Sequence, residues 1–223
     1  TKFKTWKPKL MKTFEAIKYG SNLLKENKIF SYILDSEILL SKTLNTSREK
    51  ILINLDQIIE RKKILKFKEY LKRRSMNEPI AYILEEKEFW SKNFLVNKDT
   101  LIPRPETELL VYELIQTFKD KQISILDIGT GSGCIIISLV SNLKESVGIG
   151  IDASTKAILM AKKNSIRHNL QNRIKFFHRS IDKLFDKKFD LIVSNPPYIA
   201  RKAIKNLSDD IKKYEPRMAL DGG

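Results

Sequence analysis

The tetrapeptide Asn-Pro-Pro-Tyr at residues 195–198 has the residue types needed to bind a planar amide or an exocyclic amine. Its two prolines hold the backbone extended and remove two N–H donors, but the carbonyl oxygens beside them still accept hydrogen bonds. The Asn195 side chain adds one acceptor and two donors, and Tyr198 adds a flat aromatic face. We therefore predict that the substrate is bound by Asn195, Pro196, Pro197 and Tyr198. The alternative is a structural Asn-Pro-Pro turn that binds nothing.

Methyl transfer to the bound nitrogen is the chemistry that this tetrapeptide favours. An amide nitrogen is a weak nucleophile because its lone pair is delocalised. Acceptors for its hydrogens, on the Asn195 side chain and the Pro196 carbonyl, would hold it and favour pyramidalisation. A sulfonium methyl group is already a strong electrophile, so catalysis can rest on placement and orientation. The predicted catalytic residues are therefore Asn195, Pro196 and Tyr198, and no general base is required.

A second candidate site is the stretch Asp-Ile-Gly-Thr-Gly-Ser-Gly at residues 127–133, between an apolar run and a helical pattern. Glycines let the chain turn tightly and bring its backbone against a ligand, with a helix N-terminus beyond. A dinucleotide-binding loop has the spacing G-x-G-x-x-G. The spacing here is G-x-G-x-G, which disfavours an NAD-dependent oxidoreductase. We predict a cofactor-binding loop made of Gly129, Thr130, Gly131, Ser132 and Gly133.

Two carboxylates complete the predicted cofactor site. Asp152 lies 19 residues beyond Gly133, at the end of the next predicted strand, where a carboxylate can accept both hydroxyls of a ribose. Asp127 ends the strand before the loop, where it could orient the loop or receive a cationic amino group. An acidic residue here opposes a phosphate and favours a cationic nucleoside such as S-adenosylmethionine. The alternative is a glycine turn with a solvated aspartate.

Length and composition limit the class of protein. The chain has 223 residues, of which 42% are hydrophobic, and this is enough for a real core. Cys134 is the single cysteine, which excludes a disulfide scaffold, and His168 and His178 leave little for a metal site. The sequence contains no apolar run of about 18 residues. We therefore expect a cytoplasmic protein with neither a metal nor a membrane partner.

The formal net charge of +15 is compatible with a polyanionic neighbourhood such as the ribosome. However, 32 of the basic residues are lysines and 10 are arginines, and arginine is the side chain favoured for bidentate phosphate contacts. The lysines are also spread along the whole chain. We therefore favour a lysine-rich composition over a dedicated nucleic-acid surface, and we expect no stable nucleic-acid partner.

Residues 1–86 are predicted to form a small all-helical domain, because apolar residues recur there at helical spacing. Ser47 can cap a short helix that follows it. A longer helix is predicted over Gln57–Ser75, with four apolar side chains facing inward: Ile58, Ile64, Phe67 and Leu71. The domain has no glycine-rich loop, paired carboxylates or histidine cluster. We interpret it as an accessory domain for binding or positioning.

Residues 87–104 are predicted to form a linking β-hairpin with its turn at residues 91–93. Pro105 can then open a helix as its first residue, and the apolar face of that helix is predicted to be Leu109, Leu110, Leu114 and Ile115. In the remaining domain, residues 105–223, strands and helices alternate, which predicts a Rossmann-like parallel sheet. Ligands of such sheets bind at the carboxyl ends of the strands. Four strands are predicted, at residues 123–128, 147–151, 174–178 and 189–194.

Taken together, these residues resemble a known family. They look like class I S-adenosylmethionine-dependent methyltransferases with an amino-group motif. More narrowly, they look like the HemK family, the glutamine-N5 methyltransferases of peptide chain release factors. Adenine-N6 methyltransferases share the Asn-Pro-Pro-Tyr motif, so the combination of segments is what makes the resemblance specific. The segments are Glu78–Ile83, Glu88–Ser91, Leu101–Glu108, Asn195–Ile199 and Tyr214–Gly223.

The resemblance implies a function. The expected enzyme transfers a methyl group from S-adenosylmethionine to the glutamine side chain in the Gly-Gly-Gln loop of release factors, and the helical domain helps to recognise that protein. Carried over by position, Gly129–Gly133 and Asp152 contact the cofactor. Residues 195–198 hold the glutamine amide, and Asn195 also faces the cofactor. A monomer is expected.

Two features depart from the family pattern. The acidic-then-bulky pair that the family places beside the adenine falls here on Ser180 and Ile181, and Ile181 is included among the predicted cofactor contacts. Family members also continue beyond residue 223 with another helix and further strands. We therefore expect a fragment of low stability, whose sheet has an uncovered face and edge.

The family signature near the site includes Arg104, Glu106 and Glu108.

Two alternatives from other classes stay open. An adenine-N6 methyltransferase acting on DNA or RNA is compatible with the basic charge, but residues 102–108 and the helical domain do not resemble a base-flipping or target-recognition module. A non-catalytic protein derived from a methyltransferase is compatible with the missing C-terminal segment, but the intact tetrapeptide opposes it.

Overall fold

The computed structural model of the chain describes residues 10–180 and 187–223. The chain divides into two compact units, Thr1–Leu84 and Glu85–Gly223. Each unit has a hydrophobic core of its own, so each is described by itself. None of the helices in the described ranges combines the length and the apolar content needed to span a lipid bilayer.

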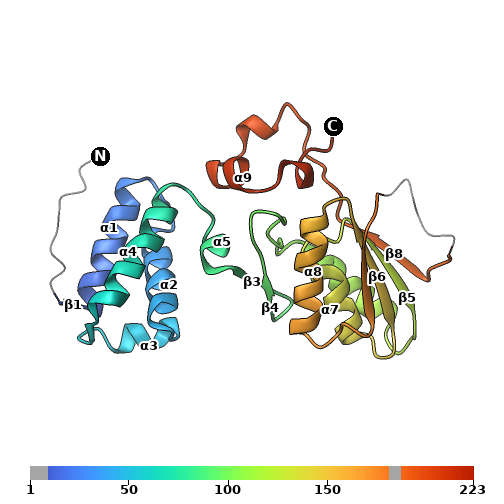
Figure 1. Ribbon diagram of the computed structural model, residues 1–223, viewed down its shortest axis with the longest axis horizontal. Helices are drawn as coiled ribbons and strands as arrows, with labels where there is room; N and C mark the ends of the chain where they lie inside the picture. Colours follow the sequence, from blue (N-terminus) through green and yellow to red (C-terminus); the bar gives the residue numbers. More distant parts are fainter. Residues whose placement is uncertain (1–9, 181–186) are drawn as a thin grey trace. The chain divides into compact units, whose positions relative to one another are not determined.

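The first unit is a helical bundle with one short strand pair (Figure 1). Ile58 and Ile59 pair with Lys12 and Met11 as antiparallel strands. The predicted helix over 57–75 therefore begins at Arg61 instead, and the unit is not wholly helical. In chain order the elements are β1 (Met11–Lys12), α1 (Thr13–Glu26), α2 (Tyr32–Leu44), α3 (Arg48–Ile53), β2 (Ile58–Ile59), α4 (Arg61–Ser75) and α5 (Ile80–Leu84).

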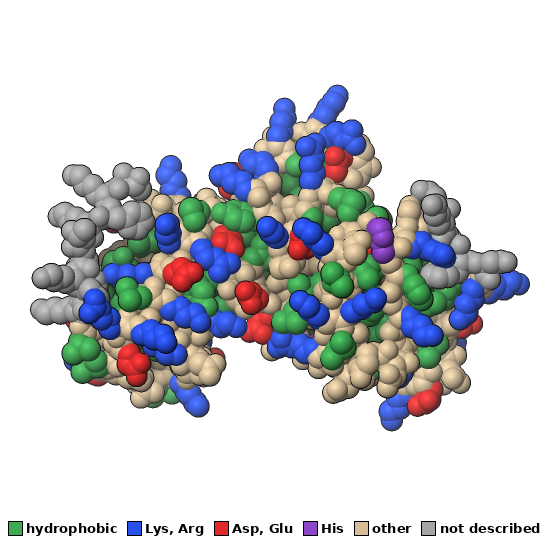
Figure 2. Space-filling model, viewed as in Figure 1, with side chains coloured by type: hydrophobic (Ala, Val, Ile, Leu, Met, Phe, Trp, Pro, Cys, Tyr) green, Lys and Arg blue, Asp and Glu red, His purple; other side chains and the backbone are tan. Residues whose placement is uncertain are grey.

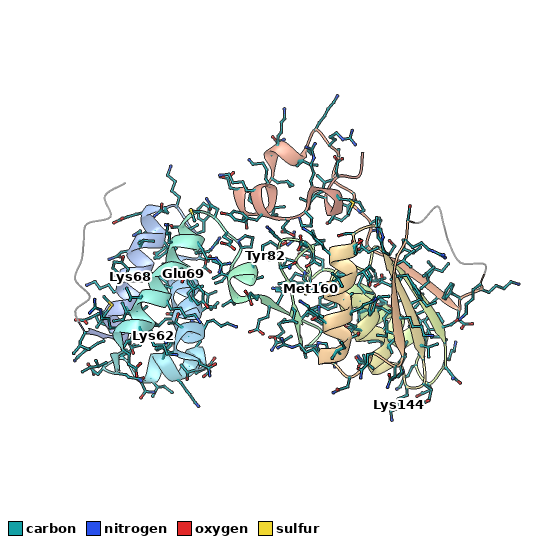
Figure 3. All side chains as sticks on the ribbon, in the orientation of Figure 1. Lys62, Lys68, Glu69, Tyr82, Lys144 and Met160 are labelled. Atoms are coloured by element: carbon teal, nitrogen blue, oxygen red, sulfur yellow. The ribbon has the colours of Figure 1, made fainter. Side chains whose placement is uncertain are left out.

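The core of this unit lies between α1, α2 and α4. The predicted inward positions Ile64, Phe67 and Leu71 are each at most 1% exposed, whereas Ile58 is 60% exposed because it lies in β2. Lys62 and Glu69 are exposed on the same α4 helix (Figure 3). The amphipathic pattern therefore predicted the buried side of α4 correctly and missed only the place where the helix begins.

The predicted cap of α3 is confirmed. Ser47 Oγ accepts a hydrogen bond from the backbone N–H of Lys50 at 3.4 Å, which satisfies one of the free donors at the helix start.

The second unit opens with the predicted hairpin, formed by β3 (Glu86–Phe89) and β4 (Lys92–Leu95). Its turn is Trp90-Ser91, not residues 91–93. Both turn residues have positive φ, 53° and 52°, which is the geometry of a two-residue hairpin turn. Helix α6 (Thr107–Thr117) follows, two residues after Pro105. Of the predicted apolar face, Leu110, Leu114 and Ile115 are partly buried against the core, whereas Leu109 is 65% exposed and was predicted wrongly. The fully buried residue of the helix is Val111.

The rest of the unit is the predicted alternation of parallel strands and helices. The strands form one sheet in the order β7-β6-β5-β8, which confirms the Rossmann-like fold class. Helices α7 and α8 pack on one face of the sheet, and α6 packs against α7 (Figure 1). The elements are β5 (Ser124–Ile128), α7 (Cys134–Asn142), β6 (Val147–Asp152), α8 (Thr155–Arg167), β7 (Ile174–His178), β8 (Leu191–Ser194) and α9 (Asp209–Tyr214).

Charged side chains are spread over the visible face of the molecule. Figure 2 shows Lys and Arg side chains scattered over both units and not gathered in one patch. This distribution agrees with a generally basic composition more than with a dedicated polyanion-binding surface.

Candidate functional site in the second unit

The two motifs singled out in the sequence follow neighbouring strands of the sheet. Ile128 at the end of β5 is the register partner of Ser194 at the end of β8, and Ser194 Oγ donates to the Ile128 carbonyl oxygen at 2.9 Å. The next residues along the two chains are Gly129 and Asn195. Because β6 lies on the other side of β5, the strand order reverses here, and such a switch point opens a crevice at the carboxyl ends of the strands.

The glycine loop takes a conformation that glycine permits. Gly129, Gly131 and Gly133 have φ angles of 72°, 55° and 82°. A Cβ added to Gly129 would have no atom within 4 Å, so this side of the loop is open to a ligand. The N–H groups of Gly129 and Thr130 both donate to the Ile151 carbonyl at 2.9 Å, which anchors the loop to the end of β6.

Asp152 holds the loop from the next strand. Its Oδ2 accepts from the backbone N–H of Gly131 at 2.9 Å, and its Oδ1 accepts from the N–H of Ser154 at 2.8 Å. A carboxylate oxygen has about two lone-pair sites, so each oxygen keeps room for a further donor such as a ribose hydroxyl. The predicted role of Asp152 is therefore compatible with the contacts that it makes.

Asp127 lies beneath the loop and is fully buried. Its Oδ2 accepts from the Thr130 hydroxyl at 2.7 Å, whereas its Oδ1 has no hydrogen-bond partner among the described residues. Burial raises the pKa of the Asp127 carboxyl from 3.8 to about 7, and the nearby charge of Asp152 adds to the rise. Of the two roles foreseen for Asp127, this contact fits the orientation of the loop.

A cavity of about 360 Å³ lies against the loop and the tetrapeptide. Of the predicted site residues, its lining includes Gly129, Gly131, Asp152, Asn195, Pro196 and Pro197. The other predicted contacts, Asp127, Thr130, Ser132 and Gly133, are buried and are not part of this lining. Ser180 lines the cavity, and Ile181 lies outside the described residues. Sequence reasoning missed the contribution of Asp99 and Thr100, which lie after β4 and line the cavity next to Leu101.

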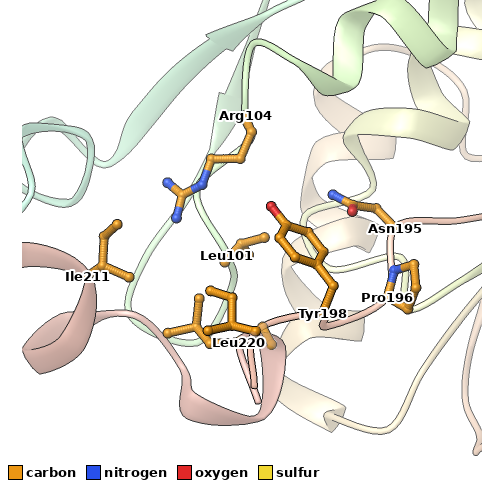
Figure 4. Close-up of a pocket in the computed structure, with 9 residues that line it drawn as sticks. Leu101, Arg104, Asn195, Pro196, Tyr198, Ile211 and Leu220 are labelled. Carbon is orange, nitrogen blue, oxygen red and sulfur yellow. The ribbon is translucent and has the colours of Figure 1, made fainter. Parts of the chain in front are cut away.

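A second, smaller hollow of about 120 Å³ opens beside the tetrapeptide (Figure 4). Its polar side chains are Arg104, Asn195 and Tyr198, and Tyr198 is 77% exposed. The apolar part of the lining includes Ile199, Ile211 and Leu220. The hollow and the large cavity share four lining residues: Leu101, Asn195, Pro196 and Ala219.

The side chain of Asn195, which lines both spaces, has a hydrogen-bond contact with the start of α6. Asn195 Nδ2 lies 3.4 Å from Thr107 Oγ1, a donor–acceptor distance at the weak end of hydrogen bonding. Of the other signature residues, Glu108 Oε1 accepts from the N–H of Trp90 at 3.0 Å, and Glu106 is exposed. Glu108 therefore acts on the hairpin turn, away from the tetrapeptide.

Asn164 is a buried residue that sequence reasoning missed. Its Oδ1 accepts from the N–H of Leu95 at 2.7 Å, and its Nδ2 donates to the carbonyls of Leu95 at 3.0 Å and Ser132 at 2.8 Å. A signal was present in the sequence, because Asn164 falls three residues after Ala161 on the inward side of α8. A polar side chain at a core position of a helix needs partners, and here they come from the hairpin and the glycine loop.

Other reactive side chains take structural roles. His168 and His178 each contact a backbone carbonyl, those of Asn93 at 3.1 Å and Ala153 at 2.9 Å. Burial raises the pKa of the Cys134 thiol to about 12, which leaves it protonated and a poor nucleophile. Within residues 10–180 and 187–223, no three His, Cys, Asp or Glu side chains are grouped closely enough to hold a metal ion.

The large cavity fits S-adenosylmethionine on the observations above. Gly129 leaves open space where a side chain would block the approach of a ligand. Asp152 offers carboxylate acceptors at the end of β6, where a ribose could donate its hydroxyls. The charged lining is mixed, because Arg179 also lines the cavity and Asp99 pairs with Lys156 at 3.3 Å. A parallel sheet with a glycine loop after one strand and a carboxylate after the next is the arrangement of class I S-adenosylmethionine-dependent methyltransferases.

Comparisons with known proteins define the family. Residues 15–84 match the family description "PrmC N-terminal domain", and residues 105–214 match "Methyltransferase small domain". The release factor glutamine methyltransferase of Buchnera aphidicola is 44% identical over 186 residues, which cover 83% of this chain and 67% of that protein. The protein of the same name from Caulobacter vibrioides is 35% identical over 216 residues, 96% of this chain and 74% of its own length. The chain belongs to the release factor glutamine methyltransferase family.

Among solved structures, a SAM-dependent methyltransferase from Agrobacterium tumefaciens covers 52% of this chain and 40% of its own, with 19% identity and a TM-score of 0.44.

Proposed function

We propose that this chain transfers a methyl group from S-adenosylmethionine to the side-chain amide nitrogen, N5, of the glutamine in the Gly-Gly-Gln motif of peptide chain release factors. The observation that carries the proposal is the position of Asn195, which lines both the large cavity and the smaller hollow. A cofactor against the glycine loop and an amide in the smaller hollow would therefore meet at one side chain. Family membership supports the choice of substrate.

In this proposal the large cavity binds the cofactor, which supplies an electrophilic methyl group on a positively charged sulfur. Gly129 and Gly131 allow the backbone to approach it closely, and the Asp152 oxygens accept the ribose hydroxyls. Asn195 lines the same cavity, so a methyl group supplied there would lie within its reach.

The tetrapeptide then holds the glutamine amide. The Asn195 side-chain oxygen and the Pro196 carbonyl accept the two amide hydrogens, which turns the nitrogen lone pair towards the methyl group. The ring of Tyr198 covers the planar amide. In this proposal no side chain acts as a general base, and the proton that the nitrogen releases passes to water. Orientation, not proton abstraction, accounts for the catalysis.

Both spaces lie in one copy of the second unit, so we propose that the chain acts as a monomer. Because release factors act on the ribosome, we place the reaction in the cytoplasm. Release factors are then the partner, and no stable nucleic-acid or membrane partner is required.

The test is transfer of labelled methyl from S-adenosylmethionine to purified release factor, with DNA and RNA as competing substrates. We expect label in release factor at the glutamine of the Gly-Gly-Gln motif. Asn195→Ala should abolish transfer and change the dissociation constant of the cofactor less than about threefold, since the glycine loop and Asp152 are untouched. Asn206→Ala, an exposed asparagine outside both spaces, is the matched control.

Asp152→Ala should have the opposite profile, with the dissociation constant of the cofactor raised at least about tenfold, or about 1.4 kcal/mol. Label found in nucleic acid and not in release factor would favour an adenine-N6 methyltransferase and contradict the proposal. Turnover of Asn195→Ala near the wild-type level would show that the amide is not held as described.

A further inference from the structure

Arg104 is the one charged side chain in the lining of the smaller hollow that the structure describes. It comes from the segment between the hairpin and α6. In Figure 4 its guanidinium and the Tyr198 hydroxyl are directed towards one another across the hollow. In the proposed methyl transfer Asn195, Pro196 and Tyr198 hold the amide, but Arg104 has no role.

The orientation of Arg104 is set by Glu215, which follows α9 directly. Glu215 Oε1 lies 2.6 Å from Arg104 Nη2, and Glu215 Oε2 accepts the backbone N–H of Ile102 at 3.1 Å. The Glu215 side chain is 1% exposed, whereas that of Arg104 is 28% exposed. Both carboxylate oxygens are thus engaged by residues of one short segment. A buried, charge-assisted contact of this length holds the guanidinium in a single direction.

The pairing also determines what kind of ligand Arg104 suits. A guanidinium has five N–H donors in a planar fork, and the contact with Glu215 occupies Nη2. Because Glu215 neutralises the positive charge, a phosphate would gain little net attraction here. A neutral acceptor keeps the full benefit of a fixed donor, since it brings no charge that must be desolvated. A carbonyl oxygen therefore fits the remaining donors better than an anion.

The surroundings point to the same class of ligand. The hollow is mostly apolar, with Ile199, Ile211 and Leu220 in its lining, which suits the methylene groups of a side chain. Asn195 and Arg104 lie on the same small space of about 120 Å³, so a ligand whose amide reaches Asn195 must bring its neighbouring atoms past Arg104. In a polypeptide the hydrogen-bond acceptors next to a side-chain amide are main-chain carbonyl oxygens, and a guanidinium, which has only donors, would bind these.

We propose that Arg104 determines specificity for a polypeptide by donating hydrogen bonds to a main-chain carbonyl oxygen next to the target amide. Glu215 is a positioning residue that acts through Arg104. This inference rests on the proposed function and adds to it the contact that distinguishes a peptide substrate from a nucleic acid.

The experiment compares Arg104→Lys, Glu215→Gln and the double variant with the wild-type chain in methyl transfer to release factor. Lysine keeps the charge but loses the planar fork. We expect Arg104→Lys to raise the KM for release factor at least about tenfold, with the cofactor dissociation constant, measured by calorimetry, changed less than about threefold. The matched control is Arg201→Lys, which changes an exposed arginine paired with Asp221 at 3.0 Å outside both spaces.

The double variant tests the role of Glu215. If Glu215 acts through Arg104, Glu215→Gln raises the KM on its own but adds nothing to Arg104→Lys. Additive effects on KM would overturn the positioning role, and an unchanged KM in Arg104→Lys would overturn the specificity role. Both of these KM comparisons are made against a wild-type chain that methylates release factor. A wild-type chain that labels nucleic acid but not release factor overturns the proposed function together with this inference, so the two failures are distinguishable.

Discussion

Asn164 Nδ2 donates a hydrogen bond of 2.8 Å to the carbonyl oxygen of Ser132, and both residues are buried. The same side chain exchanges two hydrogen bonds with the backbone of Leu95 in β4. Ser132 belongs to the glycine loop, and the chain beyond Leu95 leads to residues 99–101, which line the large cavity. One side chain therefore connects two walls of the proposed cofactor site.

Asn164→Asp should weaken cofactor binding. Aspartate has the same shape but no N–H donors, so the carbonyls of Leu95 and Ser132 would lose their partner and face a buried carboxylate. Each unsatisfied buried group costs about 1–3 kcal/mol. We expect a lower free energy of unfolding and a cofactor dissociation constant raised at least about tenfold, measured by denaturant unfolding and calorimetry.

The control for this change is Asn142→Asp. Asn142 Nδ2 also donates to a helix carbonyl, that of Ser138 at 2.7 Å, but Asn142 lies at the end of α7 away from the cavity lining. The affinity of the Asn142→Asp variant for the cofactor should therefore stay at the wild-type level. A loss of stability in Asn164→Asp with unchanged cofactor affinity would show that Asn164 supports the fold alone.

Asp127 should make the stability of the chain depend on pH. Burial raises the pKa of its carboxyl from 3.8 to about 7 in the folded state, so between these values the folded chain binds more protons than the unfolded chain. Stability must then fall as the pH rises from about 4 to 7 and level off above. At about 1.4 kcal/mol per pKa unit, the whole change is about 4 kcal/mol at most.

Asp127→Asn should flatten this pH dependence, as measured by the free energy of unfolding at several pH values from 5 to 8. Asp190→Asn is a useful comparison, because the backbone N–H of Ser124 lowers the pKa of Asp190. That group stabilises the chain above its unfolded pKa and loses this effect as the pH falls, so its removal leaves the slope between pH 5 and 7 intact. An equal slope in wild type and Asp127→Asn would contradict the prediction.

Gly222→Ala should impair turnover. A Cβ at Gly222 would lie 2.7 Å from the Pro197 carbonyl oxygen and 3.0 Å from Tyr198 Cα. These are backbone atoms and cannot give way without moving the tetrapeptide. We expect kcat to fall at least about tenfold, since a small displacement of the bound amide is costly for an oriented reaction. Steady-state kinetics with release factor would measure it.

Gly129→Ala is the comparison for this substitution. A Cβ there meets no atom within 4 Å, but the φ of 72° strains any residue other than glycine. Its effect should fall on the cofactor dissociation constant, because the loop shape changes while the tetrapeptide does not. If Gly222→Ala and Gly129→Ala both changed kcat, or both changed the cofactor dissociation constant, by the same factor, then the amide site and the cofactor site would not be separate as proposed.

Much of the second unit followed from local patterns in the sequence. Apolar runs and helical spacing predicted the four parallel strands and their helices, and β7 has the predicted bounds. The predictions were wrong where a local apolar pattern was compatible with two structures. Ile58 suited the start of a helix but pairs with Lys12 of β1, a contact across 46 positions that periodicity does not carry. On α6 the predicted inward residues Leu110, Leu114 and Ile115 do pack against the core, but Leu109 is exposed and Val111 is buried instead.

The sequence by itself determined the groups whose chemistry is local. Positive φ at Gly129, Gly131 and Gly133 favours glycine, and the donors and acceptors of residues 195–198 are properties of those residue types. Only the tertiary structure decided how they are supported. Asn164 contacts Leu95, 69 positions away in the sequence, and Glu215 contacts Arg104, 111 positions away. The polar atoms of Asn164 and Glu215 are buried and therefore need hydrogen-bond partners. Only the fold determines which backbone group or charge lies close enough to be that partner.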